Sequence, residues 1–496
     1  MKRVSKNSFA TIILCAIFLT GIISFANPLI AQAQKPTTKS GTDASVETWA
    51  KPNAKFEADK MGDMSGWDPL KWENPKGDVI KIAIVWPHSG PATGTGEIAW
   101  ACATFAAYDI NQRGGILVDG KKKKIALYKA DTMSKQDQAK KICERMVLQE
   151  KVDILVGSSG SNIQKVINEV GARHKVITQN VGCLTDDLQD ATNFSRYSFM
   201  SSDTTTSIAR GMAYYYGQIR KKEKKFYILC QDYSFGRDMG EWFKKGLKEY
   251  YPEAEVVGED YHKLFLTDFA PYLTKITSSG AEVVWTGDWL PDAGTLLKQA
   301  RQMDIKIPFA NLFVDEPNAL HDIGVEGTKG LVNITHAEKA GPAFKDPGFI
   351  KYYKAWNDQW KKWNSPPYKT PLYEHGGAGG TILYWTQQIY WLLSVIERAQ
   401  STDPEKIISI WEGDTYQFVN GRLNKMRICD HKAIQGFRVA EYVPPEEQKV
   451  SMNIPPYYWF KGCSYTGPSW EIPAEKVLPL MDPKLDRCKG KNEWGE

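Results

Sequence analysis

The chain has 496 residues, of which 42% are hydrophobic and 12% are aromatic, and its formal charge at pH 7 is +5. This apolar content excludes a wholly disordered protein, and the length leaves room for two or three domains. The dense basic runs, Lys121–Lys124 and Lys221–Lys225, are expected in solvated loops that lead into strands, so the sequence predicts no nucleic-acid partner.

The N-terminus has the organisation of a secretory signal. Lys2, Arg3 and Lys6 precede an apolar run over residues 9–25, and Ala31-Gln32-Ala33 forms a small-x-small cleavage site. This order predicts a cleavable signal peptide over residues 1–33 and an exported protein, with an uncleaved membrane anchor as the alternative. Removal of the three leader cations lowers the formal charge by three, which leaves the body nearly neutral.

Residues 34–78 are rich in Lys, Thr, Ser, Asp and Pro, with Trp49, Trp67 and Trp72 spaced among them. We interpret this stretch as an N-terminal arm that docks its tryptophans on the body.

A regular alternation of strands and helices begins at residue 79. Apolar runs predict strands at 79–86, 125–130 and 153–156 and from residue 176, and helical spacing predicts helices at 97–113, 134–150 and 163–173. Such alternation is typical of a parallel sheet covered on both faces, here the first part of lobe 1 over residues 79–201.

The same rhythm restarts over residues 202–329, the first part of lobe 2. It predicts helices at 205–220, 236–250, 268–279 and 291–304, and strands at 226–229, 255–257, 282–286 and 307–310. Two doubly wound α/β units in tandem place a ligand cleft between them, at the carboxyl ends of their strands.

Residues 330–442 are interpreted as returning segments that complete both lobes. They contain a predicted strand at 331–334, helices at 347–363 and about 372–399, and a hairpin within 412–442 that turns at Asn420-Gly421. Residues 443–496 lack clear periodicity and are interpreted as a C-terminal wrapping extension.

Seven cysteines follow the predicted leader, so at least one must stay unpaired. Cys463 with Cys488 could close the tail, and Cys102 with Cys143 could join two neighbouring helices; the sequence leaves the pairing open.

One stretch has the character of an anion-binding loop. The apolar run Ile154–Val156 closes the predicted strand 153–156, and Ser158, Ser159 and Ser161 follow it before the predicted helix 163–173. Free backbone N–H groups at a helix start, together with such hydroxyls, can hold a small anion. The alternative role for Ser161 is that of a helix N-cap.

Motifs for catalysis, metals and cofactors are weak. Gly94–Ala99 fits G-x-G-x-x-A, but a long loop precedes it and the next strand-end acid, Asp131, lies more than thirty residues on. The seven histidines show no paired ligand spacing, which argues against a metal site. Gly157–Gly160 misses G-x-S-x-G by one position and Cys183 has no obvious base, so we expect a binding protein rather than an enzyme.

Several motifs in fixed order carry a family resemblance. They are Pro87–Pro91, Asp109–Ile116, Val156–Ser161, Gln231–Gly236, Trp285–Gly287 and Leu296–Arg301. Over about residues 79–442 the chain resembles the substrate-binding proteins of branched-chain amino acid ABC importers, which are type I periplasmic binding proteins like the leucine-binding protein.

The resemblance implies two doubly wound parallel-sheet lobes, three hinge crossings and a ligand held in the cleft for delivery to a membrane ABC permease, with no cofactor and a monomeric state. By similarity, Ser161 and the adjacent N–H of Asn162 would bind the ligand carboxylate. Other lobe-1 loops would contribute Ser89, Asn180, Val181 and Gly182. The opposite lobe would contribute Phe235 to stack on the ligand and Trp289 or Leu290 to close over it.

Two departures from the family pattern bear on the ligand. Relatives usually have Thr where Gly182 stands, and the amino-acid binders place a Glu against the ammonium where Phe313 stands here. Since a buried ammonium without a carboxylate costs several kcal/mol, Asp288, Asp315 or Glu316 would have to substitute. We therefore expect a small carboxylate ligand, either amino acid-like or an aromatic or apolar acid. The alternatives are a periplasmic sensor of the same fold, for an amide, urea or aromatic ligand and acting through a partner, and an enzyme that uses the cleft.

Overall fold

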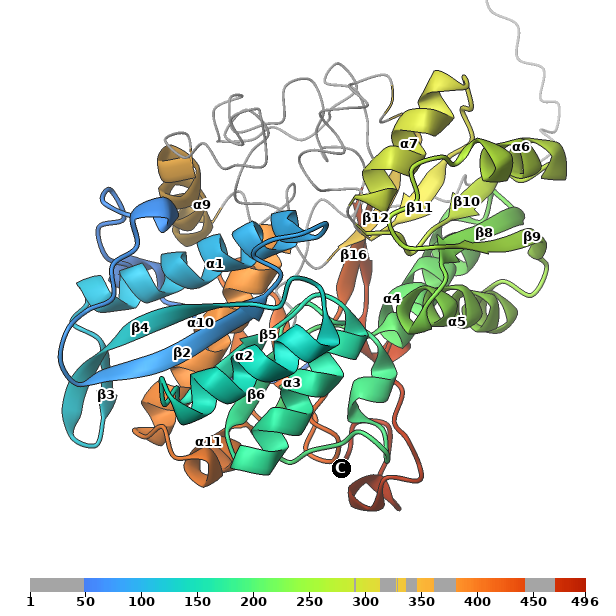
Figure 1. Ribbon diagram of the computed structural model, residues 1–496. Helices are drawn as coiled ribbons and strands as arrows, with labels where there is room; N and C mark the ends of the chain where they lie inside the picture. Colours follow the sequence, from blue (N-terminus) through green and yellow to red (C-terminus); the bar gives the residue numbers. More distant parts are fainter. Residues whose placement is uncertain are drawn as a thin grey trace, which may run out of the picture. The chain divides into compact units, whose positions relative to one another are not determined.

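A computed structural model describes residues 49–289, 291–312, 327, 329–335, 346–360, 381–441 and 469–496 (Figure 1). The predicted signal peptide lies outside these residues. In the described part of the chain, no helix combines the length and apolarity that crossing a membrane requires.

Lobe 1 is built on a six-stranded sheet with the order β3-β4-β2-β5-β6-β7, parallel except for the edge strand β3. Its strands are β2 (Val79–Trp86), β3 (Ile116–Val118), β4 (Lys121–Asp131), β5 (Ile154–Gly157), β6 (Ile177–Asn180) and β7 (Ser198–Met200). The helices that cover it are α1 (Thr93–Gln112), α2 (Gln136–Leu148), α3 (Ser161–His174) and α10 (Thr381–Ala399).

The apolar run of β2 explains why helices lie on both faces of this sheet. Ile82 and Ile84 belong to the core that includes residues of α1 and α10. Ala83 and Val85, which point to the opposite face, belong to the core of α2 and α3. A parallel strand buried on both faces needs this nearly continuous apolar sequence.

The expected loop position of Lys121–Lys124 is wrong. These lysines begin β4, because Ile116–Val118 form the antiparallel strand β3 beside them. Lys121, Lys122 and Lys124 are nevertheless exposed, and the pairing of β4 with β2 begins only at Lys124.

Lobe 2 contains a seven-stranded sheet with the order β17-β16-β12-β11-β10-β8-β9, in which β16 runs antiparallel to both of its neighbours, β12 and β17. Its strands are β8 (Lys225–Gln231), β9 (Glu255–His262), β10 (Val283–Trp285), β11 (Phe309–Asn311), β12 (Val332–Thr335), β16 (Phe437–Glu441) and β17 (Ser469–Ile472). The helices are α4 (Thr205–Tyr214), which continues into a π-helical turn over Tyr215–Arg220, α5 (Ser234–Tyr250), α6 (Ala270–Ser279) and α7 (Asp292–Gln302). Side chains of α4 and α5 pack into one core of this sheet, and those of α6 and α7 into another.

The chain passes between the two large sheets three times, after β7, after β12 and after β15. Strand β12, which we expected to return across the boundary, is a parallel member of the lobe-2 sheet, so the crossing follows it. Between the second and third crossings lie α9 (Pro347–Trp360), α10, α11 (Pro404–Trp411), β13 (Thr415–Gln417), β14 (Leu423–Met426) and β15 (Ala433–Ile434). The predicted hairpin turn at Asn420-Gly421 is confirmed between the antiparallel strands β13 and β14.

The N-terminal arm contributes β1 (Ala54–Lys55), which pairs with β13 and completes a small sheet of four strands. Trp67 is buried, with its ring 4.8 Å from that of Trp356 and 5.1 Å from that of Phe105. Its Nε1 donates to the Thr104 hydroxyl at 3.2 Å. The arm therefore packs on α1 and α9.

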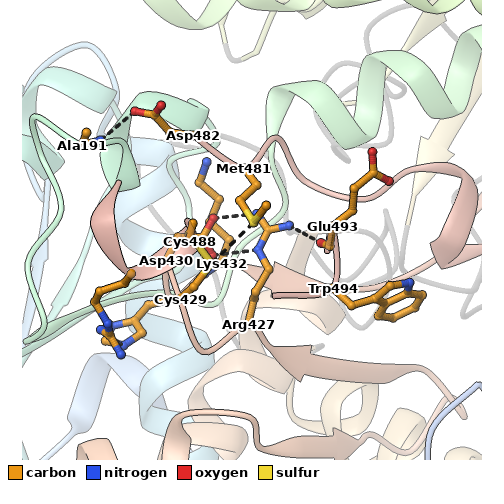
Figure 2. Close-up of a disulfide and its surroundings, with 12 residues drawn as sticks. Ala191, Arg427, Cys429, Asp430, Lys432, Met481, Asp482, Cys488, Glu493 and Trp494 are labelled. Atoms are coloured by element: carbon orange, nitrogen blue, oxygen red, sulfur yellow. Dashed lines mark hydrogen bonds and ion pairs between the residues drawn. A yellow bond between two sulfur atoms is a disulfide. The ribbon is translucent and has the colours of Figure 1, made fainter. Parts of the chain in front are cut away.

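The cysteine pairing differs from both suggested pairs. A disulfide joins Cys429 to Cys488 (Figure 2), and Cys102 and Cys143 are free and buried. The sequence separation of 59 residues hid this pair, because the chain leaves for the lobe-2 sheet before it returns to Cys429.

Candidate functional site

Loops at the carboxyl ends of strands in both sheets line a small cavity of about 30 Å³. Lobe 1 and α10 provide Thr95, Ser159, Gly160, Ser161, Gly182, Cys183, Leu184 and Trp385, and lobe 2 provides Tyr233, Phe235 and Trp289. The lobe-1 side is mainly small and polar, and the lobe-2 side is aromatic.

The loop after β5 brings the start of α3 to the cavity. Gly160 has φ +90°, a left-handed conformation that suits glycine, and it is the N-cap of α3. Ser161 is the first helical residue, so the alternative role as N-cap is wrong; its hydroxyl instead hydrogen-bonds that of Thr185. The backbone N–H groups of Ser161 and Asn162 have no partner among the described residues. They lie at the positive end of the helix dipole.

The loop after β6 is fixed by one buried amide. Asn180 accepts from the Cys183 N–H at 2.9 Å and donates to the Cys183 carbonyl at 2.7 Å. This places Gly182 and Cys183 in the cavity wall, while Asn180 and Val181 are buried behind it. Burial raises the pKa of the Cys183 thiol, which donates to the Ser158 carbonyl at 3.0 Å.

Gly182 sits where no side chain fits. A Cβ there would lie 2.7 Å from the Ser158 carbonyl oxygen, 2.8 Å from the Trp86 ring and 3.3 Å from the Trp385 ring. The two indole rings, 5.0 Å apart, fill this space.

The lobe-2 wall comes from two neighbouring strand ends. Tyr233 and Phe235 stand at the start of α5, after β8, and Trp289 lies between β10 and α7. The indole Nε1 of Trp289 donates to the Tyr233 hydroxyl at 2.8 Å, which joins the two loops.

Asp288 does not line the cavity. Its fully buried carboxylate bonds to Nε2 of His262 at 2.8 Å. Burial opposes the charged form of His262, but the carboxylate outweighs it and raises the pKa of the histidine. Nearby, the Asp292 carboxylate accepts from Gln231 at 2.7 Å and from the Phe265 N–H at 3.0 Å, and burial raises its pKa to about 6.

Two further predicted residues lie away from the cavity. Ser89 donates to the Asp131 carboxylate at 2.6 Å, and the Asn162 side chain is exposed. Leu290 and Phe313 lie outside the described residues. Of the ten predicted ligand-binding residues, the structure brings Ser161, Gly182, Phe235 and Trp289 to one cavity.

Sequence reasoning missed Thr95, Tyr233 and Trp385 among the lining residues. Tyr233 stands inside the Gln231–Gly236 motif and could have been found there. Trp385 sits on a long apolar helix, where an aromatic residue is indistinguishable from core packing.

Carboxylates of the two lobes also interact outside the lining of the cavity. Asp238 of α5 is within electrostatic reach of Asp186 and Asp187, in the short 3₁₀ helix Asp186–Gln189 of lobe 1. Burial first, and then these carboxylates, raise the pKa of Asp238 to about 7, an effect that Lys165 and Lys245 partly offset.

The chain also resembles known proteins in sequence. The family model described as periplasmic binding protein matches residues 79–448. An amino acid binding protein of Pseudomonas aeruginosa is 30% identical over 237 residues, which cover 47% of this chain and 59% of the relative. The chain thus matches somewhat more than half the length of that relative.

Two solved structures share the fold. A periplasmic binding protein from Burkholderia mallei, 21% identical, superposes with a TM-score of 0.65 over 83% of this chain and 99% of that one. A solute binding protein of an ABC transporter from Rhodopseudomonas palustris, in complex with 3,4-dihydroxy benzoic acid, is 17% identical and gives 0.62 over 74% and 94%. These likenesses confirm the predicted two-lobed α/β fold.

Proposed function

Because the chain belongs to the periplasmic binding protein family, we propose that it is an exported solute-binding protein that captures a small carboxylate in the cavity between its lobes. Membership confirms the resemblance seen in the motif order, and this is a family of substrate-binding proteins rather than enzymes.

The observation that carries the proposal is the start of α3 at the cavity wall. In our proposal the ligand carboxylate accepts from the N–H groups of Ser161 and Asn162 and from the hydroxyls of Ser159 and Ser161. The helix dipole favours the same anion. Asn180 and Val181 act through the loop that they hold, not by touching the ligand.

The size of the cavity supports capture by lobe closure. At about 30 Å³ it admits little more than a water molecule, whereas ligand pockets usually measure about 300–1,000 Å³. A solute therefore enters when the lobes separate, and its affinity depends on how far it favours the closed state over the open one.

The names of the relatives support a carboxylate. One is an amino acid binding protein, and another is a solute binding protein with 3,4-dihydroxy benzoic acid bound; both kinds of molecule carry a carboxylate. The second belongs to an ABC transporter, which supports delivery of the captured solute to an ABC permease.

The test is calorimetric titration of the mature protein with amino acids, aromatic acids and short-chain carboxylates, followed by Ser161→Ala on whichever acid binds. The loss of the hydroxyl should weaken carboxylate binding by about 1–3 kcal/mol, since an acceptor is left underbonded. Asn162→Ala is the control, because it keeps the backbone N–H and removes an exposed side chain. Equal affinities in both variants would refute the anion site.

A further inference from the structure

We propose that Trp385 is a specificity-determining residue of the cavity and that it selects a flat aromatic carboxylate. This inference rests on the proposed function and names the class of ligand for the same site. Trp385 belongs to α10, outside every motif that carried the resemblance.

An aromatic surface stands where the resemblance implies a hydroxyl. Relatives usually have Thr where Gly182 stands. Here the Ser158 carbonyl oxygen at 2.7 Å and the Trp86 ring at 2.8 Å exclude a Cβ at Gly182, and the Trp385 ring lies 3.3 Å from that position. Trp385 lines the cavity, so an indole replaces the hydrogen-bonding group next to the anion loop.

The lobe-2 wall of the cavity is also aromatic. Tyr233, Phe235 and Trp289 face the same cavity from lobe 2, and the bond between Trp289 and Tyr233 fixes the two rings relative to each other. A flat ring between aromatic walls gains offset-stacked or edge-to-face contacts that a branched aliphatic side chain cannot make.

The described lining of the cavity also lacks charge. None of the described residues that line it carries a charge; Asp288 and Asp292 lie outside this lining, and one oxygen of each bonds to His262 and to Gln231, respectively. An ammonium group in this wall would lose its hydration without a counter-charge. The described wall therefore favours an acid without an amino group.

The experiment compares 4-hydroxybenzoate, benzoate, leucine and phenylalanine as calorimetric probes of the wild-type protein, Trp385→Leu and Trp385→Phe. We expect the wild type to prefer the benzoates, Trp385→Leu to lose about tenfold in affinity for them, and Trp385→Phe to keep most of it. The ratio of benzoate to leucine affinity is decisive, because a merely structural role would weaken all probes alike; thermal melts check the folding of each variant. An unchanged ratio, or a wild type that binds leucine and rejects the benzoates, overturns this inference and leaves the proposed function intact. If no carboxylate of any class binds, both fall.

A separate region carries a second inference, which needs no ligand. We infer that residues 469–496, which we call the strap, form a fourth link between the lobes, closed by a disulfide, that limits how far they separate. The strap lies beyond residue 448, where the match to the family model ends.

One end of the strap is fixed to lobe 2. β17 pairs with β16 at the edge of the sheet, and the Tyr250 hydroxyl of α5 donates to the Lys476 carbonyl at 2.8 Å. Val477 belongs to the core under α4 and α5.

The other end is fixed to the loop between β14 and β15, as Figure 2 shows. Besides the disulfide, the fully buried Arg427 donates to the carbonyls of Pro479 at 3.0 Å, Leu480 at 3.2 Å and Glu493 at 2.8 Å. Lys432 donates to the Leu480 carbonyl at 2.7 Å. Charge-assisted hydrogen bonds from these two buried side chains therefore hold the main chain of the strap in place.

That loop is itself part of lobe 1. The Met200 N–H of β7 donates to the His431 carbonyl at 2.8 Å, and the His431 ring stacks on Phe199. The strap also reaches lobe 1 directly, because Asp482 accepts from the Ala191 N–H at 2.9 Å. Between Lys476, held by lobe 2, and Pro479, held by Arg427, the chain can span at most about 10 Å. Wide separation of the lobes must therefore strain or release the strap.

The test is small-angle scattering of the ligand-free full-length protein with and without the link. Cys429→Ser/Cys488→Ser should increase the radius of gyration and broaden the distance distribution, while the control Cys102→Ser/Cys143→Ser, which removes two free buried thiols, should not. Hydrogen exchange over residues 473–496 is measured in parallel. If hydrogen exchange rises there but the radius of gyration stays unchanged, the disulfide only holds the strap on the surface and the inference is wrong. If neither quantity changes, the disulfide does not affect separation of the lobes and the inference is equally wrong.

Discussion

The lobe-1 wall of the cavity is held by buried hydrogen bonds within its own loops, whereas the lobe-2 wall consists of aromatic rings joined by one bond between indole and hydroxyl. The first wall has almost no freedom, because Asn180 bonds backbone groups, Gly182 is enclosed by a carbonyl and two indoles, and the Ser161 hydroxyl bonds that of Thr185. The second wall depends on packing, which tolerates adjustment better than a network of buried polar groups. This difference suggests that lobe 1 provides a preformed anion-binding loop, whereas the aromatic wall of lobe 2 adjusts to the ligand when the lobes close.

The strongest test of this contrast is Asn180→Ala. It should lower the free energy of unfolding by about 1–3 kcal/mol, because the buried N–H of Cys183 loses its acceptor, while the Cys183 C=O keeps the Ser202 hydroxyl as a donor. Chemical denaturation measures the change. Asn162→Ala, at an exposed position of the same lobe, should stay within about 0.5 kcal/mol of wild type. Similar losses in both would contradict a wall fixed by the Asn180 amide.

A paired glycine substitution compares the two walls directly. Gly182→Ala should destabilise the protein by about 1–3 kcal/mol, since its Cβ meets a carbonyl and an indole that cannot move. Gly287→Ala, in the loop before Trp289, should cost a similar amount, because its Cβ would lie 2.8 Å from Cβ and 2.9 Å from Cγ of Met239, atoms that the backbone of α5 holds in place. Thermal unfolding of the two variants measures both losses, and a much smaller loss for Gly287→Ala would show that the lobe-2 loop yields where the lobe-1 loop does not.

The interaction of Asp238 with Asp186 and Asp187 predicts that the stability of the protein depends on pH. The pKa of Asp238 is raised from 3.8 to about 7, so the folded state binds the extra proton and stability falls as the pH rises through this range. Asp238→Asn removes this unfavourably placed carboxylate. The variant should therefore be more stable than wild type by roughly 1–2 kcal/mol above pH 7, after allowance for partial exposure, with no gain below about pH 4.

Melting curves from pH 4 to pH 8.5 test this prediction. Glu253→Gln, at an exposed position of lobe 2, serves as the control and should show no such trend. A gain for Asp238→Asn that is the same at every pH would show that the repulsion does not involve the charge of Asp238.

The smallest effect is expected at the aromatic wall. Tyr233→Phe removes the acceptor of the Trp289 indole and should lower stability by about 0.5–1 kcal/mol, because both rings remain packed. Tyr214→Phe, a half-buried tyrosine of lobe 2, is the matched control. A loss as large as that of Asn180→Ala would mean that this wall too depends on its polar bond.

Much of the fold could be predicted because its strands are buried on both faces. The run Val79–Trp86 matches β2 at both ends, and helical spacing located α1 and α5 to within a few residues. Edges were less visible: β3 is three residues long, and the lysines of β4 hide it, since an edge strand needs no apolar pattern.

Residues close together in the chain were enough to predict the two α/β lobes, the motif order that indicates the family, and the loop that carries Ser161 to a helix start, because each depends on neighbouring residues and their period. The rest of the cavity and the strap depend on contacts between distant parts of the chain. Trp385 meets Gly182 across about two hundred residues, Cys429 finds Cys488 after the chain has visited the other lobe, and Asp288 turns to His262 instead of the cavity. Such contacts are fixed by how elements pack in three dimensions, and no local pattern records them. The anion loop is thus a property of the sequence, and the wall that faces it is a property of the fold.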